Sequence, residues 1–174
     1  MDCPSGTSLF KTDKGESIVE ICNTQPVLLV FLRHFGCLFC KEALLDIAER
    51  REKYSEAGIR IIFVHMSDPE LAEKYFNDYG LSGIDHVSDV AKELYNDFGL
   101  TRGKVSQLWG LQNLIRGAQL VSNPKIPFTL KTIGDGYQMP GVFVLYKSQI
   151  LESFVHQMVS DRPEYDAMVS KFLK

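Results

Sequence analysis

One stretch of the chain decides the fold: VLLVFLRHFGCLFC, residues 27–40. Its first part, residues 27–32, is a continuous apolar run of the kind found in strands that are buried on both faces. Its last part, Cys37-Leu38-Phe39-Cys40, leads into a helical pattern that continues to Ala57. The stretch therefore predicts a strand whose carboxyl end delivers two thiols to the first turn of a helix.

The start of a helix changes the chemistry of a thiol. Unpaired backbone N–H groups and the helix dipole favour a negative charge there, so a cysteine thiol ionises below its free pKa of about 8.5. The thiolate is the nucleophilic form of cysteine. We therefore expect thiol chemistry at Cys37 and Cys40.

Helical spacing gives the two cysteines different surroundings. Cys40, Leu44 and Ile47 share one apolar face by their i, i+4, i+7 spacing, so Cys40 is expected to point towards the core and Cys37 to lie nearer solvent. Residues three apart on a helix lie about 5–6 Å apart at Cβ, and a modest adjustment brings them into disulfide range. We infer that Cys37 attacks and Cys40 resolves.

Three polar side chains flank the motif. Arg33, His34 and Lys41 could each add positive charge near the thiolate, and His34 could also carry a proton. The alternative is that Arg33 and Lys41 are solvated and that His34 only packs. We take the three residues as supporting candidates for the thiol site.

Zinc binding is the competing interpretation of a CxxC motif, and it needs four ligands. The sequence holds no second CxxC and no HxxxH, and Cys3 and Cys22 are isolated from the pair and from each other. The histidines His65, His86 and His156 form no ligand pattern. We therefore expect no metal and no other cofactor. Two structural cysteines that merely share a helix are the remaining alternative.

Strand and helix signals alternate beyond this stretch, which predicts an α/β fold. We expect a mixed sheet flanked by helices, with parallel β-α-β units first and an antiparallel hairpin and a helix at the end. Further strands are expected at residues 59–66, 84–87, 142–146 and 150–156. Further helices are expected at residues 69–79, 89–98, 105–118 and 163–173.

The remaining segments are expected to be irregular within one domain, residues 1–174. Residues 1–14 are rich in Ser, Thr, Gly and Lys and should be peripheral, residues 17–22 should form a short strand or turn, and residues 121–138 contain Pro and Gly and should form an extended loop. The apolar stripe of residues 105–118 is expected to pack on the core, with a partner-binding or membrane-surface helix as the alternative.

Composition excludes several classes of partner. The chain has 174 residues, 45% of them hydrophobic, and a net charge of -3, which suits one globular domain. The pI of about 5.8 gives no reason to expect nucleic acid or an anionic membrane. There is no signal-peptide pattern and no apolar run near the roughly 20 residues of a membrane span. Four cysteines are too few for a secreted disulfide scaffold, so we expect a reducing, cytoplasmic location.

The stretch from residue 29 to residue 41 resembles the LRxFGCxxCR signature of the peroxiredoxin-like proteins. These form a thioredoxin-fold branch of the alkyl hydroperoxide reductase/thiol-specific antioxidant superfamily, which includes the prostamide/prostaglandin F synthase type. The similarity continues through residues 87–89 and 93–100 and resumes at residues 141–145. It thus covers most of the chain.

This resemblance implies a thioredoxin-like, peroxiredoxin-like fold with Cys37 and Cys40 as the redox pair. It further implies an enzyme that acts on peroxides or protein disulfides and is reduced by an external thiol, such as the thioredoxin or glutathione system. Thioredoxin-like proteins carry a cis-proline that faces the CxxC, which suggests a substrate groove at Met139 and Pro140. Trp109 lies off the main apolar stripe and is a further candidate for lining that groove.

Two departures limit what the family can lend. Thioredoxin places a buried Asp six residues before its first redox Cys, where this chain has Phe31. Typical peroxiredoxins place Pro and Thr/Ser seven and three residues before the attacking Cys, where this chain has Val30 and His34. The predicted function is thus a thiol-dependent oxidoreductase. The sequence does not predict how efficient it is as a peroxidase. The alternatives are an endoperoxide-specific reductase of the prostaglandin-synthase type and a non-catalytic thioredoxin-like binding module.

Overall fold

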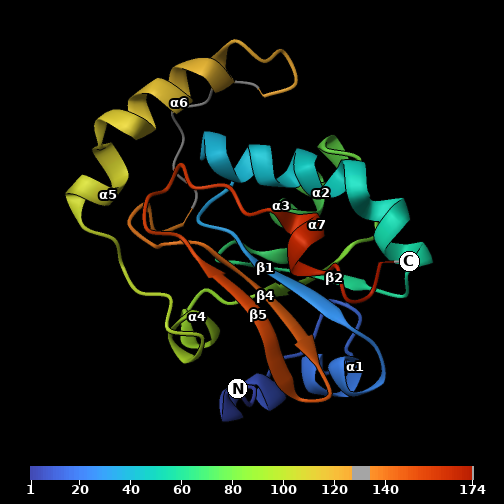
Figure 1. The fold of residues 1–174 in the computed structure, drawn as a ribbon. Helices are drawn as coiled ribbons and strands as arrows, with labels where there is room; N and C mark the ends of the chain where they lie inside the picture. The colour runs from blue at the N-terminus through green and yellow to red at the C-terminus, as the bar shows by residue number, and fades with distance from the viewer. Residues whose placement is uncertain (127–133, 174) are drawn as a thin grey trace.

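The computed structural model describes residues 1–126 and 134–173. Its centre is a five-stranded sheet in the order β3-β2-β1-β4-β5 (Figure 1). β1 pairs in parallel with β2, and β2 with β3, whereas β1–β4 and β4–β5 are antiparallel. The strands are β1 (Val27–Phe31), β2 (Arg60–His65), β3 (Asp85–Ser88), β4 (Gly141–Tyr146) and β5 (Gln149–Val155).

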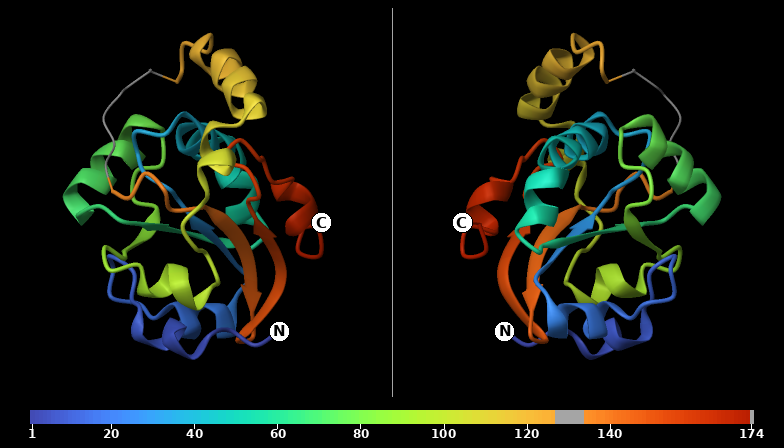
Figure 2. Two further views of the ribbon diagram at one scale, coloured as in Figure 1. Left: turned by 90° about the vertical axis from the view of Figure 1, so that its left-hand side faces the viewer. Right: turned by 90° about the vertical axis from the view of Figure 1, so that its right-hand side faces the viewer.

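Helices cover both faces of this sheet (Figures 1 and 2). One face carries α2 (Leu38–Glu56), α3 (Pro69–Asp78) and α7 (Tyr165–Met168). The other carries the short 3-10 helix η1 (Ser5–Leu9), α1 (Ile18–Thr24) and α4 (Glu93–Asp97). Two helices stand away from the sheet: α6 (Leu111–Val121) lies beyond α2, and α5 (Val105–Trp109) leads into it (Figures 1 and 2).

The apolar run of β1 is explained by this layering. Leu28 and Val30 pack under α2 and α3, while Leu29 and Phe31 pack under α1 and α4. Because alternate side chains of a strand point to opposite faces, a strand between two helical layers needs an apolar residue at every position. The predicted mixed α/β sheet and its terminal hairpin are confirmed.

The amino-terminal segment differs from the prediction. Residues 17–22 were expected to be a strand or turn, but they begin the helix α1, whose Ile18, Ile21 and Cys22 are buried at helical spacing. Residues 1–14 are not wholly peripheral, since Thr7 and Thr12 are buried. Their polar, Ser-rich composition suggests exposure, but tertiary packing buries some of these side chains.

Two helices are shorter than the periodicity predicts. The helix expected at 89–98 starts only at Glu93, because Lys92 before it has a left-handed backbone (φ 61°) that a helix cannot continue through. The Asp89 carboxylate accepts hydrogen bonds from the N–H groups of Glu93 and Leu94 at 3.0 and 2.9 Å in the first turn. The helix expected at 163–173 is regular only as α7. Beyond it the Phe172 N–H donates to the Val169 carbonyl at 2.9 Å, an i to i−3 bond that tightens the chain into turns.

The region expected to be a loop at 121–138 is described in part. α6 extends to Val121, residues 127–133 lie outside the described residues, and Gln138 forms a bridge with Arg102. The helix predicted at 105–118 is broken at Gly110, whose extended backbone (φ -65°, ψ 157°) separates α5 from α6. No helix among the described residues has the length and apolarity needed to cross a bilayer.

Candidate active site

The CxxC motif lies at the start of α2, just after the segment that connects β1 to this helix. Cys37 is the N-cap of α2, held from both sides: its N–H donates to the His34 carbonyl at 3.0 Å, and its carbonyl accepts from the Lys41 N–H at 3.1 Å. Cys40 follows within the first turn. This is the placement that the strand-CxxC-helix pattern predicts.

Both sulfurs are buried. Cys37 is 6% exposed and Cys40 is 4% exposed, so the expected contrast between an outward and an inward thiol is slight. The reason lies far along the chain, because Pro140, His156 and Tyr165 help to enclose the space beside the helix start. The periodicity of α2 alone does not predict that these distant segments cover Cys37.

Arg33 touches both sulfurs through different groups. Its side-chain Nη1 lies 3.5 Å from Cys37 Sγ, and its backbone N–H donates to Cys40 Sγ at 3.3 Å. The guanidinium is fixed by the Gly136 carbonyl, which accepts from Nε at 2.8 Å and also from Nη2. Arg33 is therefore tethered beside the thiols rather than solvated.

The two thiols are driven to opposite protonation states. The pKa of Cys37 is lowered to about 6, first by a hydrogen bond from the Cys40 thiol and then by the Arg33 charge and the backbone N–H groups of Cys40 and Phe39, against the effect of burial. Burial, followed by the hydrogen bond and charge of Cys37, raises the pKa of Cys40 well above its ordinary value. At neutral pH the pair is one thiolate and one thiol.

His34 and Lys41 differ from their predicted roles. Burial, followed by the charges of Arg33 and Lys41, lowers the pKa of His34 to about 4, so His34 is neutral at pH 7 and adds no positive charge. Its Nδ1 is buried without a hydrogen-bond partner among the described residues. Lys41 is buried rather than solvated, and burial lowers its pKa while the charge of Cys37 opposes that shift.

A small pocket opens onto the thiols. Its enclosed space is about 20 Å³, which suffices for roughly one water-sized molecule. Pro140 lines it. The Met139–Pro140 peptide is trans, unlike the cis-proline that the resemblance suggests. The lining residues are Val30, Phe31, Leu32, Arg33, Cys37, Phe39, Cys40, Ala43, Pro140, Val142, His156, Val159 and Tyr165.

The other two groove candidates lie elsewhere. Met139 packs behind the pocket wall with Leu108 and Val159. Trp109 is 69% exposed on α5 and is not among the lining residues. The exposed Trp109 side chain therefore does not line the pocket beside the thiols.

Sequence reasoning missed His156 in this pocket. His156 is buried, its N–H donates to the Pro140 carbonyl at 3.4 Å, and its Nδ1 has no hydrogen-bond partner among the described residues. Burial lowers its pKa to about 4. The signal was present, because the register of the predicted hairpin pairs Gly141 with Val155 and thus puts the next residue beside Pro140.

The apolar stripe of α5 and α6 faces solvent. The prediction that it packs on the core is wrong for most of its length, because the inward residues are Leu108, Asn113 and Leu120. α6 is tied to α2 by Arg116, whose Nη2 donates to both carboxylate oxygens of Glu42 at 2.7 and 2.6 Å. The exposed apolar residues are Val105, Trp109, Leu111, Leu114, Ile115 and Val121, and we call them the outer face.

The other two cysteines are neighbours, although they are isolated in sequence. A hydrogen bond between their thiols is the main cause of a pKa near 7 for Cys22 and of a raised pKa for Cys3. The backbones of both also bond to the turn between β4 and β5, Cys3 to Ser148 and Cys22 to Lys147. The chain thus contains two pairs of thiols rather than one.

Comparison with known proteins identifies the family. Residues 46–160 match the family model of the AhpC/TSA antioxidant enzymes. The chain belongs to the AhpC/TSA family. The match begins within α2, so it rests on residues other than Cys37 and Cys40, and the family assignment is independent of the CxxC motif.

Curated relatives of this AhpC/TSA protein carry two names. Prostamide/prostaglandin F synthase of Salmo salar is 32% identical over 101 residues, which are 57% of this chain and 50% of the relative. Peroxiredoxin-like 2C of Bos taurus is 27% identical over 137 residues, 72% of this chain and 58% of the relative. The chain therefore spans between half and three fifths of the length of these relatives.

Solved structures agree on the fold of this AhpC/TSA protein. A peroxiredoxin Q of Xanthomonas campestris superposes with a TM-score of 0.65 at 13% identity, covering 99% of this chain and 93% of its own. A peroxiredoxin 6 of Arenicola marina gives 0.62 at 11% identity, covering 94% and 67%. The thioredoxin-like, peroxiredoxin-like fold is thereby confirmed.

The lowered pKa of Cys37 predicts a pH dependence for this AhpC/TSA protein. A lowered thiol pKa means that the thiolate is gained on raising the pH through about 6, instead of about 8.5 for a free thiol. Arg33→Gln should move this midpoint upward, because it removes a charge that favours the thiolate. Thiolate absorbance in the ultraviolet, taken as the difference between wild type and Cys37→Ser, measures it.

The matched control is Arg51→Gln, since Arg51 donates to the carbonyls of Gly80 and Ser82 rather than to a sulfur. Its midpoint should equal that of the wild type. A wild-type midpoint at the free-thiol value, or equal midpoints in wild type and Arg33→Gln, would contradict the assignment.

Proposed function

We propose that the chain is a thiol-dependent oxidoreductase that acts on peroxides or disulfides, with Cys37 as attacking and Cys40 as resolving residue. The observation that carries this proposal is the opposed pKa shifts of two thiols that hydrogen-bond to each other beside a pocket. A nucleophilic thiolate next to a protonated thiol is the state that a redox cycle starts from. Family membership supports the same chemistry.

The cycle with a peroxide has three balanced steps. The Cys37 thiolate attacks a peroxide oxygen, the O–O bond breaks, and the sulfur becomes a sulfenic acid while an alcohol or water leaves with one proton from the surroundings. The Cys40 thiol then attacks that sulfur, so that a disulfide forms and water leaves. Two external thiols reduce the disulfide and are themselves oxidised to a disulfide.

With a disulfide substrate the first bond differs. The Cys37 thiolate attacks one sulfur, a mixed disulfide forms, and the other sulfur leaves as a thiol after protonation. Cys40 then displaces the first sulfur and closes the Cys37–Cys40 disulfide. Arg33 serves in both routes by holding positive charge near the sulfur, and His34, being neutral, serves as a packing or proton-relay group.

The size of the pocket bears on the substrate. A space of about 20 Å³, close to the size of one water molecule, suits hydrogen peroxide or the tip of a hydroperoxide better than a bulky substrate. An endoperoxide-specific activity, the alternative that the family resemblance offers, needs a larger space than this pocket has. We therefore favour a small peroxide over an endoperoxide, with an external thiol system as electron donor.

The remaining assignments follow from this chemistry. We propose that residues 1–174 act as one thioredoxin-like domain without a bound cofactor, in a reducing compartment such as the cytoplasm. A reducing compartment supplies the thiols that close the cycle.

Oxidation of the full chain tests the proposal. One equivalent of hydrogen peroxide, added to reduced protein, should link Cys37 to Cys40, and peptide mass spectrometry after alkylation should find that disulfide. The variant Cys3→Ser/Cys22→Ser is the matched control, because it removes the other thiol pair and should give the same Cys37–Cys40 product. A Cys37–Cys40 pair that stays reduced under excess peroxide and excess disulfide would refute the proposal.

A second candidate function is favoured by one observation, the solvent exposure of the outer face of α5 and α6. Soluble proteins seldom expose several neighbouring large apolar side chains without a binding role. In this alternative the chain is a non-catalytic thioredoxin-like binding module that captures a partner on the outer face. Redox-inert cysteines in the oxidation experiment, together with stoichiometric partner binding that Leu111→Glu abolishes, would favour it.

A further inference from the structure

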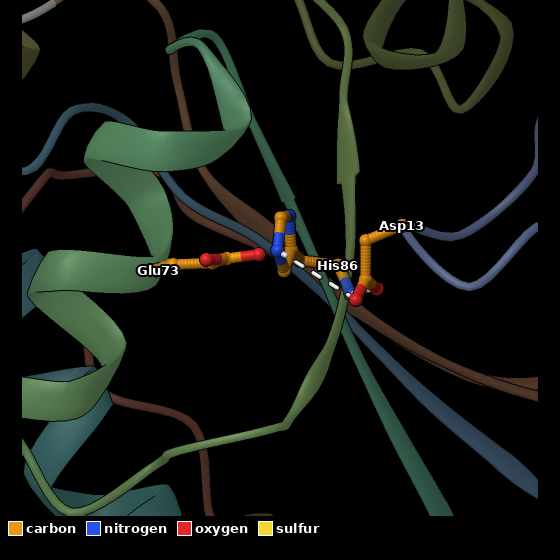
Figure 3. Close-up of side chains that lie close together, drawn as sticks. All are labelled: Asp13, Glu73 and His86. Atoms are coloured by element: carbon orange, nitrogen blue, oxygen red, sulfur yellow. Dashed lines mark hydrogen bonds and ion pairs between the residues drawn. The ribbon is translucent and has the colours of Figure 1, made fainter.

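A cluster of two carboxylates and one imidazole lies on the far edge of the sheet from β5. His86 belongs to the edge strand β3, Glu73 to α3, and Asp13 to the turn between the bridged residues Lys11 and Ser17. Figure 3 shows the His86 ring between the two carboxylates. Sequence spacing gave no ligand pattern here, because the three residues come from three separate segments.

The geometry suits a shared ligand. One ligand atom from each residue lies within 4.8 Å of the others, and His86 Nε2 is 4.0 Å from Asp13 Oδ2. Tetrahedral ligands at zinc distances lie about 3.3–3.6 Å apart. Asp13 and Glu73 are exposed, so their side chains can rotate inward by the small difference that remains.

The imidazole is the observation that points to a ligand. His86 is 2% exposed, and its Nε2 has no hydrogen-bond partner among the described residues. The ring is held from behind by His65, whose Nε2 lies 2.9 Å from His86 Nδ1. A metal-binding histidine is usually oriented in this way through its second nitrogen.

Asp13 is equally well placed. Its N–H donates to the His86 carbonyl at 2.8 Å, and its Oδ1 accepts from the His86 N–H at 2.9 Å. These two bonds fix the residue against β3 and leave Oδ2 for another partner. A neighbouring pocket of about 230 Å³ is lined by all three residues and holds room for water molecules that would complete a coordination shell.

From these observations we propose that Asp13, Glu73 and His86 bind a divalent transition-metal ion of the zinc class. One imidazole nitrogen and two carboxylate oxygens match zinc, whereas Mg²⁺ and Ca²⁺ prefer all-oxygen sites and Cu(I) prefers sulfur. The site shares no residue with the thiol pocket.

Binding reverses a chain of hydrogen bonds. Ser67 N–H donates to His65 Nδ1 at 3.2 Å, so His65 donates from Nε2 to His86 Nδ1, and neutral His86 carries its proton on Nε2. A metal on Nε2 moves that proton to Nδ1, which then donates to His65 Nε2. His65 must carry its own proton on Nδ1, and Ser67 loses its acceptor. The amide of Ser67 thus reports on occupancy of the site.

The test uses the full chain with all four cysteines replaced by serine, which removes both thiol pairs as competing zinc ligands. Titration with Zn²⁺ alone should give a saturable binding event, followed by calorimetry, and a shift of the Ser67 amide resonance in NMR spectra. Glu73→Gln should weaken this event at least about tenfold, as loss of a supporting contact already does. His86→Phe should abolish it while keeping the ring contact with Phe76.

Asp78→Asn is the control, because Asp78 is the last residue of α3 and lies outside the cluster; it should bind as the parent does. Glu73 is exposed, so Glu73→Gln folds even if His86→Phe does not. Unchanged Zn²⁺ affinity in Glu73→Gln, or a Ser67 amide that does not move on saturation, overturns the proposal.

Discussion

Cys37→Ser is expected to lower the turnover of peroxide or disulfide by roughly 10³-fold or more, the scale seen when a nucleophile is removed. The serine hydroxyl keeps the size of the thiol but stays protonated at neutral pH, so neither the Arg33 charge nor the helix start can produce an anion there. Turnover should be followed with hydrogen peroxide, an organic hydroperoxide and a protein disulfide, each with thioredoxin or glutathione as reductant.

Two variants sharpen this result. Cys40→Ser should still react once with peroxide, because Cys37 remains, and should stop at a sulfenic acid that a trapping reagent detects by mass. Cys3→Ser is the matched control outside the pocket and should keep the wild-type rate. Wild-type turnover in Cys37→Ser would remove this cysteine from the mechanism.

Phe31→Ala is expected to lower the free energy of unfolding by about 3–5 kcal/mol. The Phe31 ring is buried and contacts three others, with centroid distances of 5.0 Å to Tyr95, 5.1 Å to Phe98 and 5.6 Å to Phe143. Removing it leaves a cavity among aromatic rings that cannot collapse far. A loss of this size is a large part of the 5–15 kcal/mol typical of a domain.

Urea denaturation measures this effect as a lower midpoint at an unchanged slope. Val155→Ala is the comparison, since Val155 is on the edge strand β5 and partly exposed, and it should cost less than about 1 kcal/mol. A Phe31→Ala cost as small as that of Val155→Ala would show that the aromatic cluster does not support the fold. At the position where thioredoxin has its buried Asp, this chain thus has an aromatic side chain that packs in the core.

Local patterns in the sequence were sufficient for the sheet and for the thiol pair. The apolar run of β1, the CxxC and the Pro-started helix α3 are each encoded within a few residues. Asp68 caps α3 by accepting a hydrogen bond from the Leu71 N–H at 2.9 Å. The hairpin was also found, because its two apolar runs flank a polar turn. These elements are predictable because the residues that determine them are close together in the sequence.

The sequence did not show which helix faces pack against the rest of the protein, nor which distant segments come together. Helical spacing identifies an apolar stripe with Leu111 and Ile115, but it does not say whether that stripe turns inward, and here it turns outward. Likewise nothing local places His86 beside Asp13. Such contacts join segments far apart in the chain, and they are decided by packing of the whole.

The two contacts of the Arg33 guanidinium link the thiol site to a distant segment of the chain. One residue holds the Cys37 sulfur and the Gly136 carbonyl at the same time. When the proposed disulfide forms, the anion at Cys37 disappears, and the guanidinium keeps its hydrogen bonds to the Gly136 carbonyl. Oxidation of a buried sulfur would therefore change the charge balance of a contact that holds Gly136, which lies 103 positions after Arg33 along the chain.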